Sequence, residues 1–130
     1  MEWKRKDLWS RRGRDFCVEI SHREEERVGW SGRHRWNIYA YIYPKHHLFD
    51  AFDGDSMFQQ ATENLPMHGG PSSLQWHRDN TGTLCSVQVG CDYNHIDDEA
   101  FTHTDVESAE SVFRDAEILF AHLQEGQDDN

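Results

Sequence analysis

The stretch RWNIYAYIY, residues 35–43, decides the fold because its side chains alternate strictly between two kinds. One face of the extended chain would carry Trp36, Ile38, Ala40 and Ile42. The other would carry Asn37, Tyr39, Tyr41 and Tyr43. This period of two predicts a strand with one face in the core and one lined by tyrosines. Pro44 ends the strand, since proline has no N–H to donate to a ladder.

Three more segments outside this stretch have strand character. DFCVEISH (15–22) alternates in the same way, while SLQWHR (73–78) and TLCSVQVGCDY (83–93) flank the turn sequence 79–82. In the last segment Cys85, Val87, Val89 and Cys91 fall on one face, so both cysteines are expected to be small buried residues. A short helix is expected from Asp55 or Ser56 through Asn64.

The clearest helix lies near the C-terminus. Thr104 and Glu107 have capping-box spacing, and apolar residues recur at steps of three and four up to Leu123. Gly126 is expected to stop this helix and to begin a tail, 126–130. At the other end, residues 1–14 interleave Trp3, Leu8 and Trp9 with cations, which predicts a basic arm or a short first helix.

These elements predict a single α+β domain, residues 1–130: a four-stranded antiparallel sheet packed on one long C-terminal helix, with a short middle helix. No apolar run is long enough for a membrane span, and the start has no secretory h-region. Three cysteines do not suggest a disulfide framework. We therefore expect reduced thiols and a cytoplasmic protein.

Charge is distributed very unevenly. The net charge is −11, but residues 1–35 hold ten Lys and Arg against seven acids, and residues 36–130 hold three against seventeen. This asymmetry concerns partners and solubility rather than fold. One explanation is internal, with the basic segment lying against the acidic half of its own chain. The other is that the acidic half faces a cationic partner.

The tyrosine face also has two interpretations. Tyr39, Tyr41 and Tyr43 have apolar bodies and polar tips, which suits a recognition surface or a homodimer interface. Alternatively, the N-terminal segment with Trp3 and Trp9 covers this face.

Catalytic and metal-binding motifs are missing from the sequence. Asp92, His95 and His103, with His77 nearby, are the best ligand set, but their spacing fits no standard zinc or calcium pattern. We find no nucleophile elbow, HExxH motif or phosphate-binding glycine loop. The expectation is a non-enzymatic protein without cofactor or metal, with a metal-dependent enzyme at this set as the alternative.

Six segments distributed over residues 15–123 carry a family resemblance: FCVEIS, HRWNIYAYIYPKH, AFDG, LPMHGGPS, VGCDYNH and VFRDAEILF. The chain resembles a family of short, uncharacterised bacteriophage and prophage proteins with no known shared activity. The resemblance implies a context, the cytoplasm of a bacterial host, where small acidic phage proteins, anti-CRISPR proteins among them, inhibit or redirect host machinery.

The sequence hypothesis is therefore a protein that binds a host nucleic-acid-handling or defence protein through its acidic surface. A dense anionic surface can occupy a basic groove, and charge complementarity speeds association. The expected contact residues are Asp97, Asp98, Glu99, Glu107, Glu110, Glu117, Tyr39, Tyr41 and Tyr43. Direct nucleic-acid binding is not expected, because the acidic remainder repels a polyanion. A self-associating structural or adaptor protein remains the third alternative.

Overall fold

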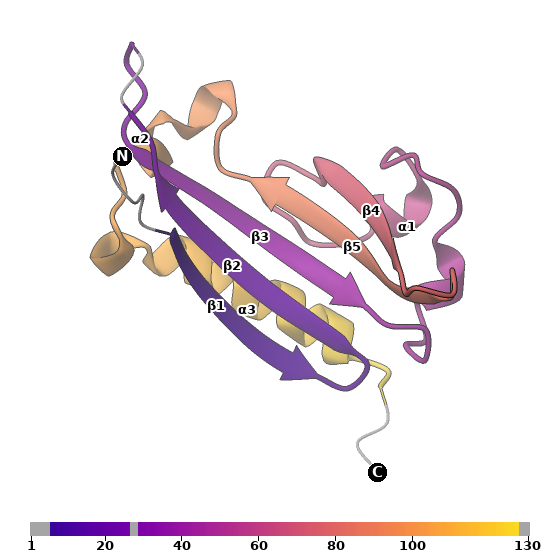
Figure 1. The fold of residues 1–130 in the computed structure, drawn as a ribbon. Coiled ribbons are helices and arrows are strands. Elements are labelled where there is room, and N and C mark those ends of the chain that lie inside the picture. The colour runs from indigo at the N-terminus through magenta and orange to yellow at the C-terminus, as the bar shows by residue number, and fades with distance from the viewer. Residues whose placement is uncertain (1–5, 27–28, 128–130) are drawn as a thin grey trace.

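The structure, a computed structural model, describes residues 6–26 and 29–127. Its centre is a five-stranded antiparallel sheet with strand order β1-β2-β3-β5-β4. Figure 1 shows helix α3 behind β1 and β2, and α1 beside β4 and β5. The strands are β1 (Lys6–Gly13), β2 (Phe16–Glu24), β3 (His34–Ile42), β4 (Ser73–Arg78) and β5 (Leu84–Asp92). The helices are α1 (Gln60–Glu63), α2 (Glu99–Thr102) and α3 (Glu110–Gln124), with 3₁₀ turns η1 (Phe49–Ala51), η2 (Ile96–Asp98) and η3 (Val106–Ser108).

The α+β class, the antiparallel sheet and the long C-terminal helix are confirmed, but the sheet has five strands rather than four. The extra strand is β1, where the sequence suggested an arm or a short helix. Trp9 points to the helix side and stacks on Trp36 with ring centroids 6.0 Å apart, while its neighbour Leu8 is 55% exposed. Adjacent apolar residues are compatible with an edge strand, because one of its faces can remain in water. Trp3 lies outside the described residues.

The alternation in β3 builds the core as predicted. Ile38 pairs with Ile20 of β2 and with Cys91 of β5, so three strands bring apolar side chains to the same face. Helix α3 covers that face with its buried stripe, Val112, Ala116, Leu119 and Leu123. The segment between β3 and β4 extends the same core over the far half of the sheet. There Phe49 of η1 meets Trp76 of β4 edge to face at 5.7 Å, and Phe52 and Leu65 are buried.

Helix α3 begins later than its predicted capping box. Asp105 caps η3 by accepting a hydrogen bond from the Ser108 N–H at 2.9 Å, and α3 itself starts at Glu110. The Thr104 hydroxyl donates instead to the Ala100 carbonyl at 2.8 Å. Asp105 competes with Thr104 as a cap because a carboxylate is an equally good acceptor one residue further on.

The two β5 cysteines do not share one environment. Cys91 is completely buried, and burial raises the pKa of its thiol to about 12. Cys85 is exposed, so its predicted burial was wrong. The register between β4 and β5 shifts at His77 and Arg78, which pair with Ser86 and Leu84 and leave Cys85 between them. Such a bulge breaks the alternation of faces.

No helix within the described residues is long and apolar enough to cross a bilayer.

Candidate protein-binding site

The tyrosine face of the sheet is not covered by the N-terminal strand. Trp9 packs between Trp36 and Phe113, on the helix side, so the predicted cover does not form within the described residues. Tyr39 and Tyr41 are half-buried on the opposite face. Figure 1 shows this face turned toward the viewer, with α3 behind the sheet. The tyrosines and the α3 carboxylates therefore belong to opposite sides of the sheet.

The tyrosines pack against the sheet and its polar neighbours. A Cβ atom on Gly90 would lie 2.7 Å from the Tyr39 ring, so Tyr39 rests directly on the β5 backbone. Tyr41 lies beside His77, with ring centroids 6.2 Å apart, and His77 is hydrogen-bonded to Gln88 at 2.6 Å. Burial raises the pKa of Tyr41 to about 12. Tyr43 follows the end of β3 and donates its backbone N–H to the Asp15 carbonyl at 3.0 Å.

Four of the predicted acidic residues are exposed: Asp97, Glu99, Glu107 and Glu110. They lie in the segment running from η2 to the start of α3. Figure 1 places this segment at the end of the sheet where the β2–β3 hairpin projects. This part of the predicted acidic surface is available to a partner.

Asp98 and Glu117 behave differently. Asp98 is 4% exposed, with one carboxylate oxygen 2.7 Å from His68 Nε2 and the other accepting the His95 backbone N–H at 3.1 Å. Its assignment to the exposed surface was wrong, because both of its carboxylate oxygens are hydrogen-bonded within the molecule. Glu117 is exposed but pairs with Arg11 of β1 at 2.8 Å. Part of the basic segment therefore does lie against the acidic half, as the internal explanation expected.

The alternative metal site does not assemble. His95 lies 3.1 Å from an Asp92 carboxylate oxygen, whereas His103 is hydrogen-bonded through Nε2 to the Trp30 carbonyl at 3.1 Å, and His77 is on the tyrosine face. Within residues 6–26 and 29–127, no three His, Cys, Asp or Glu side chains come together so that they could hold a metal ion.

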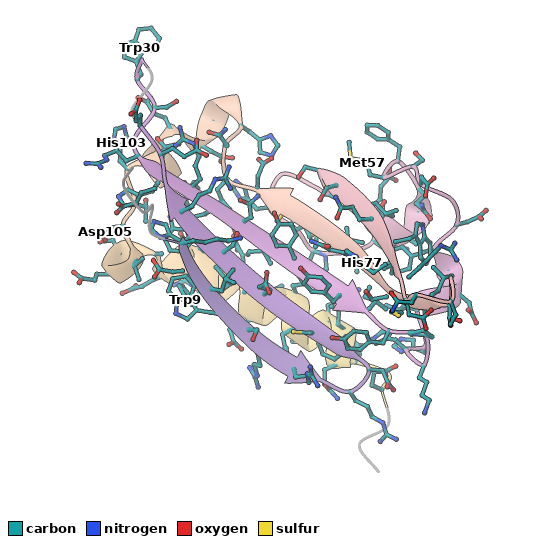
Figure 2. All side chains as sticks on the ribbon, in the orientation of Figure 1. Trp9, Trp30, Met57, His77, His103 and Asp105 are labelled. Carbon is teal, nitrogen blue, oxygen red and sulfur yellow. The ribbon has the colours of Figure 1, made fainter. Side chains whose placement is uncertain are left out.

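Trp30 is the residue that sequence reasoning missed. It is 86% exposed, the highest value among the large apolar side chains of the described chain. Figure 2 shows it beyond the end of the sheet, at the tip of the β2–β3 hairpin and pointing away from the body. Burial of an indole makes one of the largest single contributions to the free energy of binding at an interface. An indole left in water is therefore a candidate contact residue. The available signal was a tryptophan between Gly29 and Gly32, in a charged connection between two predicted strands, where core residues are not expected.

The hairpin that carries Trp30 is fixed to α2. The Gly32 N–H donates to the Thr102 hydroxyl at 2.7 Å, and that hydroxyl donates to the Glu99 carbonyl at 2.6 Å. His103 Nε2–H donates to the Trp30 carbonyl. Buried Arg35 donates to the Gly32 carbonyl at 2.8 Å, which satisfies a further turn group. The backbone that carries Trp30 is thus held by hydrogen bonds, while the ring itself is exposed to water.

A chain of three side chains holds the base of the same hairpin. His22 is 1% exposed, with Nδ1 3.1 Å from an Asp7 carboxylate oxygen and Nε2 2.7 Å from Nδ1 of His34. Burial, and then the nearby His22, lower the pKa of His34. With both rings neutral, His34 Nδ1–H donates to His22 and His22 Nδ1–H donates to Asp7. The chain ties β1, β2 and β3 together beneath the hairpin.

A hollow of about 340 Å³ lies between the hairpin tip and α2. Its lining residues include one aromatic and one acidic residue: Trp30, Ser31, Asn94, His95, Glu99 and Thr102. We call the hairpin tip 29–34 together with residues 94–102 the hairpin end. It combines an exposed indole, a hollow and part of the exposed acidic segment.

Comparison of the chain with protein-family models, with curated proteins and with solved structures found no match.

Proposed function

We propose that the protein is a non-enzymatic binding protein of phage type that attaches to a cationic host protein through its hairpin end. The favoured partner is a nucleic-acid-handling or defence protein with a basic groove, and the favoured compartment is the bacterial cytoplasm. The observation that carries the proposal is Trp30, exposed over 86% of its surface on a hairpin held by hydrogen bonds to α2.

The anatomy of this end suits a protein interface. Interfaces concentrate their binding energy in a few aromatic and arginine anchors surrounded by a polar rim. Trp30 supplies the anchor, Asp97 and Glu99 lie in the hairpin end, and Glu107 and Glu110 follow in the adjoining segment; we call these four exposed acids the rim. Because the backbone at Trp30 and Gly32 is already held by hydrogen bonds, fewer groups need to be immobilised on binding, which lowers the entropic cost of association.

The acidic rim favours a basic partner. Unlike Glu117, whose charge meets Arg11, these four carboxylates have no Lys or Arg within salt-bridge distance among the described residues. A partner cation can therefore approach them without displacing an internal one. Their mutual repulsion is relieved when it does, which steers association at low ionic strength.

The test is capture of host proteins on the immobilised chain, compared between two charge-reversed triple variants. Asp97→Lys, Glu107→Lys and Glu110→Lys alter the rim, whereas Asp50→Lys, Asp55→Lys and Glu63→Lys make the same charge change on exposed residues near η1 and α1. We expect the rim triple and Trp30→Ala to lose the captured protein and the control triple to retain it. Added salt should weaken capture. Equal loss in both triples would show that only net charge matters, and capture unaffected in all of them would end the proposal.

A further inference from the structure

The hollow beside Trp30 has an unusual combination of walls. Trp30 lines it from the hairpin, and Glu99 and Asn94 line it from the segment 94–102. His95, also in the lining, is already engaged by Asp92. Its lining residues therefore include one indole, one carboxylate and one neutral amide.

We propose that this hollow receives an arginine side chain of the partner, with the guanidinium stacked on Trp30 and paired with Glu99. The inference rests on the proposed function and specifies its central contact.

The chemistry of the walls favours arginine over other side chains. A guanidinium is planar, so it can stack on an indole and still direct N–H groups at a carboxylate in its own plane. A lysine ammonium offers a point charge, which satisfies Glu99 without matching the ring plane. An anionic side chain is repelled by Glu99, and an apolar one would desolvate that carboxylate without compensation.

Hydrogen bonds also hold the hairpin side of the hollow against α2. The Gly32–Thr102 hydrogen bond joins the strand side of the hollow to α2, the helix on which Glu99 sits. The hydrogen bond from His103 to the Trp30 carbonyl holds the backbone that supports the indole. Arg33, an exposed cation of the hairpin itself, lines a separate hollow with Gly32, His34 and His103. The backbone beneath Trp30 and α2 is thus held together before any partner arrives, which reduces the cost of binding.

The experiment uses three short capped peptides of glycine and serine that differ at one central residue: arginine, lysine or citrulline. Citrulline keeps the planar shape of arginine but carries no charge. Binding to the full chain is measured by NMR titration, following the Trp30 indole N–H and the Glu99 amide. We expect the arginine peptide to bind about fivefold more tightly than the lysine peptide and the citrulline peptide to cause no saturable shift.

Two single variants locate the contact. Trp30→Ala and Glu99→Gln should each weaken the arginine peptide by about threefold or more, within the range of exposed cation–π and ion-pair contacts. Phe58→Ala is the matched control, because Phe58 is an aromatic side chain that is 78% exposed and does not line the hollow. It should leave the affinity unchanged. All three positions are exposed, so amide spectra should confirm an intact fold.

Three results overturn the inference: equal affinity for the arginine and lysine peptides, arginine binding that survives Trp30→Ala, or no saturable binding of the arginine peptide. None of these affects the capture experiment with charge-reversed triples, which tests the proposed function separately. If the rim triple loses capture but the arginine and lysine peptides bind equally well, the proposed function stands and the arginine site does not. The surface would then bind cations without preferring a guanidinium group.

Discussion

A Cβ atom on Gly32 would lie 2.0 Å from the backbone carbonyl oxygen of Thr102, so the β2–β3 hairpin and α2 meet backbone against backbone. A gap of that size admits no side chain. Glycine is needed here for close approach, and the Gly32 N–H to Thr102 hydroxyl bond is made at the same point. The position of the hairpin tip, which carries Trp30, relative to α2 depends on this contact.

Gly32→Ala should therefore push the hairpin away from α2. We expect a loss of about 1–3 kcal/mol in the free energy of unfolding, the usual cost of overpacking, together with weaker partner capture. Urea denaturation measures the first effect. Gly54→Ala is the control, since Gly54 has a φ of 66° but no atom within 4 Å of an added Cβ, and so reports backbone strain without collision. A loss of less than about 0.5 kcal/mol in Gly32→Ala would contradict a tight contact at Gly32.

The Asp7–His22–His34 chain makes a second stability prediction. His22→Leu removes both imidazole hydrogen bonds and leaves Nδ1 of His34 without this partner. Losing two side-chain hydrogen bonds of a buried ring should lower the free energy of unfolding by about 1–3 kcal/mol. His77→Leu is the matched substitution at an exposed histidine and should change stability by less than about 0.5 kcal/mol. If both variants unfold at the same urea concentration, the chain contributes nothing to stability.

His46 predicts how stability depends on pH. This ring is 3% exposed, its Nε2–H donates to the Leu123 carbonyl at 2.8 Å and its Nδ1 accepts the Leu48 N–H at 3.0 Å. A proton on Nδ1 would break the second bond, and burial lowers the pKa of His46. A histidine with a lowered folded-state pKa binds fewer protons folded than unfolded, so stability is full above about pH 6.5 and declines below it.

Urea midpoints measured at pH 7.5 and 5.5 check this prediction. The midpoint should fall at the lower pH, and His46→Gln, which offers a donor and an acceptor that do not titrate, should reduce the fall. His34, whose pKa is also lowered, will leave part of the dependence in place. Parallel behaviour of the wild type and His46→Gln would count against a neutral His46.

The cysteines should react at very different rates with a thiol reagent such as DTNB. Cys85 is exposed, Cys17 is half-buried with a pKa raised by burial, and Cys91 is completely buried with a pKa of about 12. The thiolate is the reactive form, so Cys85 should react first and Cys91 only on unfolding. Cys85→Ser should remove the fast phase. A fast phase that persists in this variant would place the accessible thiol elsewhere.

The tyrosine stripe faces away from α3, which leads to a prediction for Tyr41→Ser. Because this face lies on the other side of the sheet from the α3 carboxylates, capture of the partner through the hairpin end should be unchanged. The molar mass in solution should also be the same as for the wild type. A loss of capture would extend the interface to Tyr41, and a fall in mass would show that the stripe is a dimer contact.

Sequence reasoning predicted the parts of the fold that depend on local periodicity. The strand 35–43 and the apolar spacing up to Leu123 follow from side-chain alternation and helical repeat, and both elements are present. It failed where a distant residue decides the outcome. Asp98 looked like a surface acid, but His68, thirty residues away, lies against it and helps to stabilise its buried carboxylate. The exposure of Trp30 could not be predicted, since it depends on which other segments reach the hairpin tip.

The strand β1 shows the same limit. Trp9 packs against the core between Trp36 and Phe113, and its ring centroid is 5.2 Å from that of Phe113. Neither partner can be inferred from the residues near Trp9 in the sequence. Without them, a Leu–Trp pair among cations suggests an arm. The alternation that identifies a central strand is weak at an edge, where one face remains hydrated.

The contacts between β1 and α3 join residues more than one hundred positions apart, as in the Arg11–Glu117 pair. During synthesis, β1 and the β2–β3 hairpin leave the ribosome long before the helix that shields them. Their apolar face, with Trp9, Trp36 and Ile38, stays uncovered until translation has passed Phe120. For that interval the nascent chain is open to chaperones and to self-association, so the core is expected to close only after α3 has been synthesised.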